Sequence, residues 1–285
     1  MEAVNKVAVV GAGTMGAGIG QVCALHGCDV TLLDVAADAL TRARKSMEAS
    51  LSRMVKKGSL SADALPGFWE KVAFENELEK VSGADFVVEA VIENESAKKE
   101  LFRALDGLLR PGAVLASNTS SISITRLGAV TKRPEYVIGM HFMNPVPLME
   151  LVEVILGHGT SVETHELTVN LCRQLGKTPV TVSDYPGFVS NRILMPMINE
   201  AVYALMEGVA SKEDIDTVMR LGMRHPMGPL TLADFIGLDV CIEILEVLYK
   251  GIGDPKYRPC PLLRRMVDAG DLGRKTGRGF YGYED

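Results

Sequence analysis

The sequence predicts an α/β fold, in which a domain built on a mostly parallel sheet is followed by an all-helical domain. Two observations support this. Up to about residue 184, short apolar runs alternate with segments of helical periodicity, which is the pattern of βαβ units. From residue 185 onward, apolar residues recur at helical spacing until residues 279–283. We therefore expect one domain at residues 1–184 and a second at residues 185–285.

The first element joins a strand to a helix through a glycine-rich turn. The apolar run 7–10 leads into a motif that contains Gly11, Gly13, Thr14, Met15 and Gly16. Glycines at this spacing permit a tight turn, contact with a pyrophosphate and close packing of the helix on the strand. The turn therefore predicts a Rossmann-type dinucleotide site, with the helix N-terminus facing the phosphates. A glycine turn without a ligand is the alternative.

The second strand, residues 30–33, ends at Asp34. Its position, about twenty residues beyond the glycine turn, is where a carboxylate hydrogen-bonds the ribose of NAD and repels the 2′-phosphate of NADP. NAD is therefore the predicted cofactor. Arg42 and Arg44 on the next helix are within reach to supply a cation for NADP instead.

The helix at about residues 35–57 carries a basic stripe that includes Arg53 and Lys57. Such a stripe is either a solvated face or a landing site for a phosphate-bearing substrate. Residues 59–79 form an acidic, mixed segment in which Trp69 indicates packing and nothing more.

The remaining elements follow in order. Strands are expected at residues 84–93, 113–116, 136–142, 151–155 and 178–182, with helices at 96–107 and about 161–175. In the second domain we expect a helix at about residues 188–205 and a helix at about 230–249. Between them, a capping box at 211–214 predicts the start of a further helix. The helix at about 188–205 is too apolar for a domain that stands alone. We therefore expect part of it to be buried against another subunit in a homodimer.

Composition narrows the function classes. The 285 residues carry a net charge of −6, so a nucleic acid or an anionic membrane lacks a global attraction. No apolar run approaches the ~18 residues that span a bilayer, and the first strand follows the N-terminus at once, so we expect a cytoplasmic protein. The 5 cysteines form no C-x-x-C pair, which predicts buried thiols and no metal site.

His141 is the strongest candidate for chemistry. A dehydrogenase needs a base for a hydroxyl proton, and histidine suits that role near neutral pH. His141 ends an apolar strand, where the carboxyl edge of the sheet faces the crevice. His26, His158, His165 and His225 lie at a helix end or in turns and loops. A core histidine is the alternative for His141.

Glu153 lies in the next strand, between Val152 and Val154, where a carboxylate is unexpected unless it is paired. A hydrogen bond to His141 would fix its tautomer and favour the imidazolium. An edge-strand charge that points at water is the other interpretation. Ser120 and Asn191 lie at element boundaries, where they either hold a substrate oxygen or serve as cap and turn residues.

Together these motifs resemble the L-3-hydroxyacyl-CoA dehydrogenase family, and within it the short bacterial members that act on 3-hydroxybutyryl-CoA. The matching segments are residues 11–16, 117–121, 141–147, 151–155, 186–192, 226–229 and 275–281. The resemblance covers nearly the whole chain. Met143 and Arg53 depart from it, where phenylalanine and lysine are frequent.

The resemblance implies roles for individual residues. His141 would be the base and Glu153 its partner, while Ser120 and Asn191 would hold the reacting oxygen or the thioester carbonyl. Asp34, Glu93, Lys98, Asn144 and Lys275 would contact NAD, and Ser50, Arg53 and Lys57 would meet the phosphates of CoA. The activity expected is reversible, NAD-dependent oxidation of a short (S)-3-hydroxyacyl-CoA to the 3-ketoacyl-CoA, by a dimer that joins through its helical half.

Two other functions are weighed against this one. A polyol or sugar-acid dehydrogenase on the same scaffold would act on free hydroxy compounds and not on thioesters. A nucleotide-binding protein without turnover would bind NADH tightly but would have no need of His141, Glu153, Ser120 and Asn191.

Overall fold

A computed structural model describes residues 4–283, which divide into two compact units between Tyr185 and Pro186. The N-terminal unit is built on one eight-stranded sheet of order β3-β2-β1-β4-β5-β6-β7-β8. Its strands are β1 (Lys6–Val10), β2 (Asp29–Leu33), β3 (Val72–Glu75), β4 (Phe86–Glu89), β5 (Val114–Ser117), β6 (Val137–Phe142), β7 (Leu151–Leu156) and β8 (Thr178–Ser183). Strands β1 to β6 are parallel, β7 is antiparallel to β6, and β8 is parallel to β7. The predicted mostly parallel Rossmann-type sheet is confirmed.

The order of the strands explains where a ligand can enter. Chain connections leave β1 toward β2 on one side and reach β4 on the other, so β1 and β4 are neighbours in the sheet. Loops after such neighbouring strands run apart and leave a crevice at their carboxyl ends. The central strands are buried on both faces, which accounts for their nearly continuous apolar sequences.

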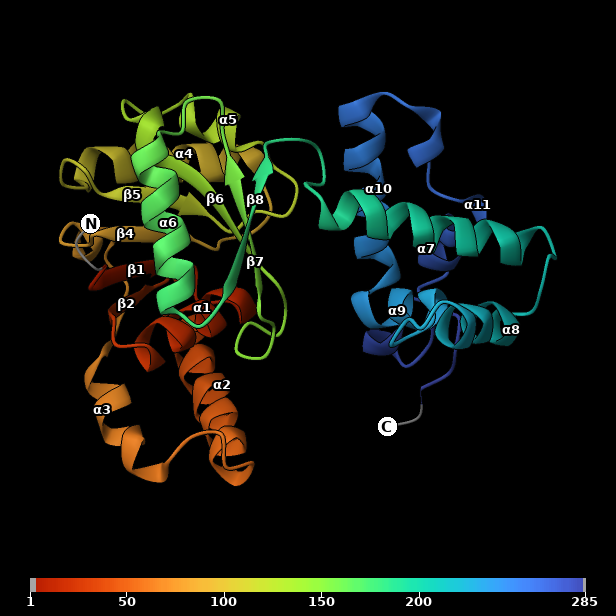
Figure 1. Ribbon diagram of the computed structural model, residues 1–285, viewed down its shortest axis with the longest axis horizontal. Helices are drawn as coiled ribbons and strands as arrows, with labels where there is room; N and C mark the ends of the chain where they lie inside the picture. The colour runs from red at the N-terminus through yellow and green to blue at the C-terminus, as the bar shows by residue number, and fades with distance from the viewer. Residues whose placement is uncertain (1–3, 284–285) are drawn as a thin grey trace. The chain divides into compact units, whose positions relative to one another are not determined.

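Six α-helices lie within the described residues of this unit, 4–185. They are α1 (Thr14–Leu25), α2 (Ala37–Lys56), α3 (Leu65–Glu70), α4 (Glu95–Leu108), α5 (Ile124–Gly128) and α6 (Val162–Gln174), with short 3₁₀ turns η1 (Ala62–Ala64), η2 (Leu78–Val81) and η3 (Pro134–Tyr136). Helix α6 lies over one face of the sheet, and α2 and α3 extend away from it (Figure 1). One apolar core joins α1 and the buried residues of α2 to the sheet.

One strand of this unit was not predicted, and one predicted strand is shorter than expected. The segment 59–79 holds a strand, β3, which pairs with β2 and forms the edge of the sheet. Its short, mixed sequence has no clear alternation, and pairing with a buried neighbour decides its conformation. The predicted strand 84–93 ends at Glu89, because the following residues turn away to border a cavity.

The C-terminal unit is helical, as predicted. Its elements are α7 (Ser190–Met206), α8 (Lys212–Thr217), a π-helical turn η4 (Val218–Gly222), α9 (Pro229–Ile236), α10 (Leu238–Ile252), η5 (Pro255–Tyr257), α11 (Pro261–Asp268) and η6 (Arg274–Thr276). Its own apolar core contains residues of α7, α9, α10 and α11. Ser211 is the N-cap of α8, because its Oγ accepts a hydrogen bond from the amide of Asp214, which is one of the two bonds of the predicted capping box.

The single helix predicted at about 230–249 is two helices. Gly237, at φ 106°, separates α9 from α10, a conformation that a residue with a side chain rarely adopts. Helix α11 was not predicted, since its apolar stripe covers little more than two turns. Near the C-terminal end of the described residues, Arg278 forms isolated bridges with Gly273 and Gly282.

The five cysteines are buried, free thiols. Within residues 4–283 no cluster of histidine, cysteine or acidic side chains could hold a metal ion. Over the same described residues, no helix combines the length and the apolar character needed to cross a bilayer.

Candidate active site

A cavity of about 630 Å³ opens at the carboxyl ends of β1, β2 and β4. It is lined by Gly11, Ala12, Gly13, Thr14, Ala17, Asp34, Val35, Ala36, Ala39, Arg42, Ala43, Ser46, Ala90, Val91 and Ile92. This is the crevice that the strand order creates, and the predicted glycine turn and Asp34 both border it.

The three glycines have three different tasks. Gly11 has φ 105°, and a Cβ there would meet the carbonyl oxygen of Ala90 at 2.5 Å. At Gly16 a Cβ would lie 1.7 Å from the carbonyl oxygen of Gly11, so the helix packs closely only without a side chain. Gly13 has nothing within 4 Å of a Cβ position, and it is the N-cap of α1 without a side-chain cap. The space over Gly13 and the amides of α1 therefore fit a dinucleotide pyrophosphate.

Asp34 is held by backbone amides. One carboxylate oxygen accepts from Ala12 N at 2.8 Å and the other from Ala36 N at 3.0 Å. Each oxygen keeps a further lone pair, which suits the two hydroxyls of a ribose. Arg42 lines the same cavity but is ion-paired with Asp38, whereas the guanidinium of Arg44 lies 5.1 Å from the ring centre of Trp69.

His141 and Glu153 face each other across two antiparallel strands. They are direct partners in the β6–β7 register, and Nδ1 of His141 lies 2.8 Å from Oε2 of Glu153. Glu153 is 2% exposed and β7 lies inside the sheet, so the edge-strand interpretation is wrong. A buried carboxylate beside Nδ1 places the ring proton there, which leaves Nε2 as an acceptor.

Ser120 completes this group from the loop after β5. Its Oγ lies 3.0 Å from Nε2 of His141, so the hydroxyl donates to the ring nitrogen. Asn118, in the same loop, accepts a hydrogen bond from the amide of Phe142 at 2.9 Å and ties this loop to the end of β6. The sequence did not single out Asn118, although it belongs to the polar cluster after β5.

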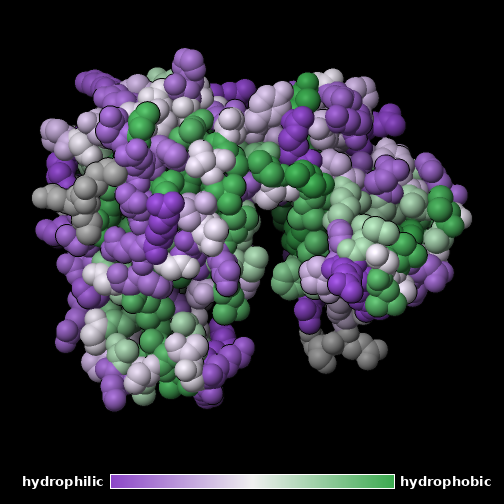
Figure 2. All heavy atoms as spheres, in the orientation of Figure 1, coloured by the Kyte–Doolittle hydropathy of each residue, from purple (hydrophilic) through white to green (hydrophobic). Residues whose placement is uncertain are grey.

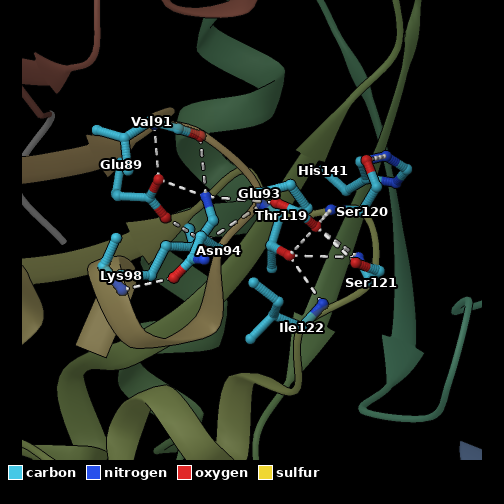
Figure 3. A network of polar contacts seen from close by, with 12 residues as sticks. Glu89, Val91, Glu93, Asn94, Lys98, Thr119, Ser120, Ser121, Ile122 and His141 are labelled. Carbon is cyan, nitrogen blue, oxygen red and sulfur yellow. Dashed lines mark hydrogen bonds and ion pairs between the residues drawn. The ribbon is translucent and has the colours of Figure 1, made fainter. Parts of the chain in front are cut away.

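Glu93 holds the Ser120 loop, as Figure 3 shows. Its Oε1 accepts from the amides of Ser120 and Ser121 at 2.9 and 3.0 Å, and from Oγ1 of Thr119 at 2.6 Å. Burial alone would raise the pKa of Glu93, but the charge of Lys98 and hydrogen bonds from Thr119, Ser121 and Ser120 outweigh it and lower that pKa.

Glu89 is a site residue that the sequence reasoning missed. It ends β4 fully buried, forms an ion pair with Lys98 and accepts a hydrogen bond from Oγ of Ser117 at 2.6 Å. A signal was present, because an acidic residue inside an apolar run needs a buried partner. The expected strand continued to residue 93, which concealed that Glu89 lies at the end of the strand.

The other predicted residues are distributed over the chain. Ser50 lies in α2, and its Oγ accepts a hydrogen bond from Gln21. Arg53, in the last turn of α2, and Lys57, its C-cap residue, are both exposed. Asn144 is exposed in the loop after β6. Asn191 is buried in the first turn of α7, and Lys275 is ion-paired with Asp239, both in the C-terminal unit. The structure therefore brings together Ser120, His141 and Glu153 of the predicted catalytic set.

A dinucleotide cavity and an oriented histidine at the same edge of a Rossmann-type sheet define a class of protein, the NAD-dependent dehydrogenases. Two family models narrow the class. Residues 6–185 match the NAD binding domain of 3-hydroxyacyl-CoA dehydrogenase, and residues 187–283 match its C-terminal domain. The chain belongs to the 3-hydroxyacyl-CoA dehydrogenase family.

Relatives are similar to this chain over nearly its full length. A probable 3-hydroxybutyryl-CoA dehydrogenase of Deinococcus radiodurans is 55% identical, over 98% of this chain and 100% of the relative. A 3-hydroxybutyryl-CoA dehydrogenase of Bradyrhizobium diazoefficiens is 51% identical, over 98% and 96%. The crystal structure of (S)-3-hydroxybutyryl-CoA dehydrogenase from Ralstonia eutropha superposes with a TM-score of 0.96 at 48% identity, covering 99% of this chain and 100% of that one.

Proposed function

We propose that the protein interconverts (S)-3-hydroxybutyryl-CoA and acetoacetyl-CoA with NAD, and that His141 is its general acid and base. One observation carries this proposal: His141 is oriented by Glu153 at 2.8 Å, and its other nitrogen lies 3.0 Å from Ser120. The names of the full-length relatives supply the substrate.

The residues of the proposed catalytic set have different roles in proton transfer. In oxidation, Nε2 of His141 takes the proton of the 3-hydroxyl group, and in reduction the ring returns it. Glu153 keeps the ring oriented and stabilises the imidazolium that forms. NAD, when bound, supplies the acceptor and donor of the hydride. Ser120 and Asn191 hold the reacting oxygen or the thioester carbonyl by hydrogen bonds.

Ser50, Arg53 and Lys57 are proposed to meet the phosphates of CoA. Ser50 and Arg53 lie three positions apart on α2, on one face of that helix, and Lys57 follows as its C-cap residue. Within residues 4–283 neither Arg53 nor Lys57 is ion-paired with a carboxylate, which leaves both cations for a ligand. Glu93, Asn144 and Lys275 are proposed NAD contacts on the family resemblance alone.

A homodimer through the C-terminal unit and a cytoplasmic location are part of the same proposal. Large apolar side chains are exposed on this unit, among them Ile193 at 67%, Val209 at 72% and Leu221 at 70%. The visible face of the unit shows several such patches (Figure 2). Apolar area of this kind is typical of a surface that a partner covers.

The test is direct. Purified protein is mixed with NADH and acetoacetyl-CoA, and the loss of absorbance of the reduced nicotinamide is followed. Free acetoacetate and sugar-acid substrates are run in parallel. Turnover with the thioester supports the proposal, while turnover only with free acids selects the polyol or sugar-acid alternative. Tight NADH binding without any turnover would select a non-catalytic role.

A further inference from the structure

Glu89, at the end of β4, is a fully buried carboxylate whose two oxygens hold different parts of the candidate site. It takes no step in the proton transfer described above. A buried carboxylate costs free energy unless its oxygens are well paired, and an apolar side chain could end the strand without that cost. The partners of the two oxygens therefore indicate what this charge is for.

Oε1 of Glu89 holds the wall of the dinucleotide cavity. It accepts a hydrogen bond from the amide of Val91 at 2.7 Å, and Val91 lines the cavity together with Ala90 and Ile92. The same oxygen accepts from Nζ of Lys98 at 2.5 Å, and this ammonium also donates to the carbonyl oxygen of Val91 at 3.3 Å. Both backbone groups of Val91 are bound to one buried ion pair, so a shift of the pair would shift the wall.

The glycine turn packs directly against this wall. The amide of Ala90 donates to the carbonyl oxygen of Val10 at 2.7 Å. A Cβ at Gly11 would meet the carbonyl oxygen of Ala90 at 2.5 Å, so the wall and the turn are in contact through their backbones. The position of the wall therefore sets the shape of the cavity beside the turn that faces the pyrophosphate.

Oε2 of Glu89 holds the start of the loop that carries Ser120. It accepts from Oγ of Ser117 at 2.6 Å, and that hydroxyl oxygen accepts in turn from the amide of Thr119 at 3.2 Å. Because the hydroxyl proton is given to the carboxylate, the lone pairs of Oγ are free to face Thr119. The amide of Asn118 also donates to the carbonyl oxygen of Glu89 at 2.8 Å. The carboxylate thus fixes the backbone immediately before Ser120.

We propose that Glu89 is a positioning residue, which sets the cavity wall for NAD through Oε1 and the Ser120 loop for proton transfer through Oε2. Figure 3 shows Glu89 at one end of a polar network and His141 at the other. The proposal rests on the function proposed above and gives its cofactor cavity and its Ser120 loop a common support. Lys98 remains a proposed NAD contact by the family resemblance, and the ion pair with Glu89 fixes its ammonium for that contact.

Two variants of the full-length protein separate the two oxygens. Glu89→Gln removes the charge and weakens both sets of contacts, so we expect the Kd for NADH to rise about tenfold and kcat to fall about tenfold. Ser117→Ala removes only the contact of Oε2, so kcat should fall about three- to tenfold, with the Kd for NADH within about twofold of wild type. Fluorescence titration measures the Kd, and turnover of acetoacetyl-CoA at saturating NADH gives kcat.

Asp106→Asn is the matched control. Oδ1 of Asp106 lies 2.7 Å from Nε of Arg133, and the other oxygen accepts from the amide of Lys132 at 2.8 Å. This largely buried carboxylate thus has a cation and a backbone amide as partners, like Oε1 of Glu89. It lies near the end of α4, which leads to the amino end of β5, at the opposite edge of the sheet. We expect a lower melting temperature in Asp106→Asn, with kcat and the Kd for NADH as in wild type.

Three results would overturn the proposal. A lower melting temperature in Glu89→Gln without a rise in the Kd for NADH would make Glu89 a structural residue only. Equal changes of kcat and Kd in Asp106→Asn would attribute both effects to general destabilisation. A rise in the Kd in Ser117→Ala as large as that in Glu89→Gln would show that the two oxygens do not act separately.

A second variant and a binding measurement keep the test decisive. If Glu89→Gln does not fold, because Lys98 is left buried without a counter-charge, Glu89→Asp keeps the charge on a shorter side chain and is judged by the same outcomes. If wild-type protein does not turn over acetoacetyl-CoA, the proposed function fails, and NADH titration alone judges Glu89. A raised Kd then supports its role at the cavity wall, and an unchanged Kd overturns it.

Discussion

Buried polar side chains serve different purposes in the two units. In the C-terminal unit, Asn199 and Asp234 bond mainly to backbone groups. Asn199 joins the chain at Arg258 and Cys260, and Asp234 accepts from the amides of Phe280 and Tyr281 at 2.8 and 2.9 Å. These side chains replace missing secondary-structure hydrogen bonds where segments meet.

Along the carboxyl edge of the N-terminal sheet, buried polar side chains bond to one another. His141 pairs with Glu153, and Lys98 pairs with Glu89. The comparison teaches that a side-chain to backbone contact indicates architecture, whereas a buried side-chain network at a strand end indicates a site.

The largest effect is expected at His141. Replacement by glutamine removes proton transfer and should lower kcat about 10²- to 10⁴-fold, while the melting temperature and the Kd for NADH stay near wild type. Steady-state kinetics measures kcat, fluorescence titration measures the Kd for NADH, and thermal unfolding gives the melting temperature. His165→Gln is the control, since Nε2 of His165 lies 2.8 Å from the hydroxyl of Thr181, an exposed threonine of β8. A loss of cofactor binding in His141→Gln would show that the site is misplaced.

Replacement of Asp234 should lower stability and leave activity unchanged, the reverse of what we expect at His141. Asp234→Ala leaves the buried amide of Phe280 unpaired and should lower the free energy of unfolding by about 2–4 kcal/mol, with kcat per folded molecule unchanged. Thermal unfolding and activity assays give the two quantities. Asp254→Ala, which removes an exposed cap, should change the melting temperature little. If Asp234→Ala lost activity but not stability, the contrast between the units would fail.

Gly13→Val tests the contribution of the cavity to NADH binding separately from the stability of the fold. A Cβ at Gly13 meets nothing within 4 Å, so stability should hold, but the side chain occupies the space over the turn. We expect the Kd for NADH to rise about tenfold or more. Gly107→Ala, on the exposed side of α4, should leave that Kd unchanged. Unaltered NADH binding in Gly13→Val would place the pyrophosphate elsewhere.

The smallest effect is expected at Asp38. This carboxylate pairs with Arg42, which lines the cavity, so Asp38→Asn frees a cation near Asp34. We expect NADPH binding to improve only about twofold, because exposed pairs of this kind are weak. Glu48→Gln removes the ion-pair partner of Arg44 in the same way. Because Arg44 is stacked on Trp69, we expect this variant to leave NADPH binding unchanged. Equal shifts in both variants would indicate a general charge effect.

The dinucleotide site could be predicted from sequence because its signals are local. The glycine spacing, the following helix and the acid after the second strand all lie within residues 11–34. His141 and Glu153 were predicted from position and from an unexpected charge among valines. Their pairing depends on β7 running antiparallel to β6, which the sequence did not indicate.

What could not be predicted depends on tertiary contacts. Strand β3 forms because β2 offers it an unpaired edge, and the break at Gly237 depends on how α9 and α10 pack. Glu89 and Lys98 are nine positions apart, and nothing local shows that a strand end and a helix bury them together. The network around Ser120 was therefore beyond sequence reasoning, although most of its members lie in predicted elements.

The direct opposition of His141 and Glu153 in the β6–β7 register sets limits on how this chain can change in length. Side chains alternate between the two faces of a strand, so one residue inserted within β7 before Glu153 would turn its carboxylate to the opposite face. An insertion in the loop between β6 and β7 leaves the register untouched. An insertion or deletion inside either strand would therefore separate the pair.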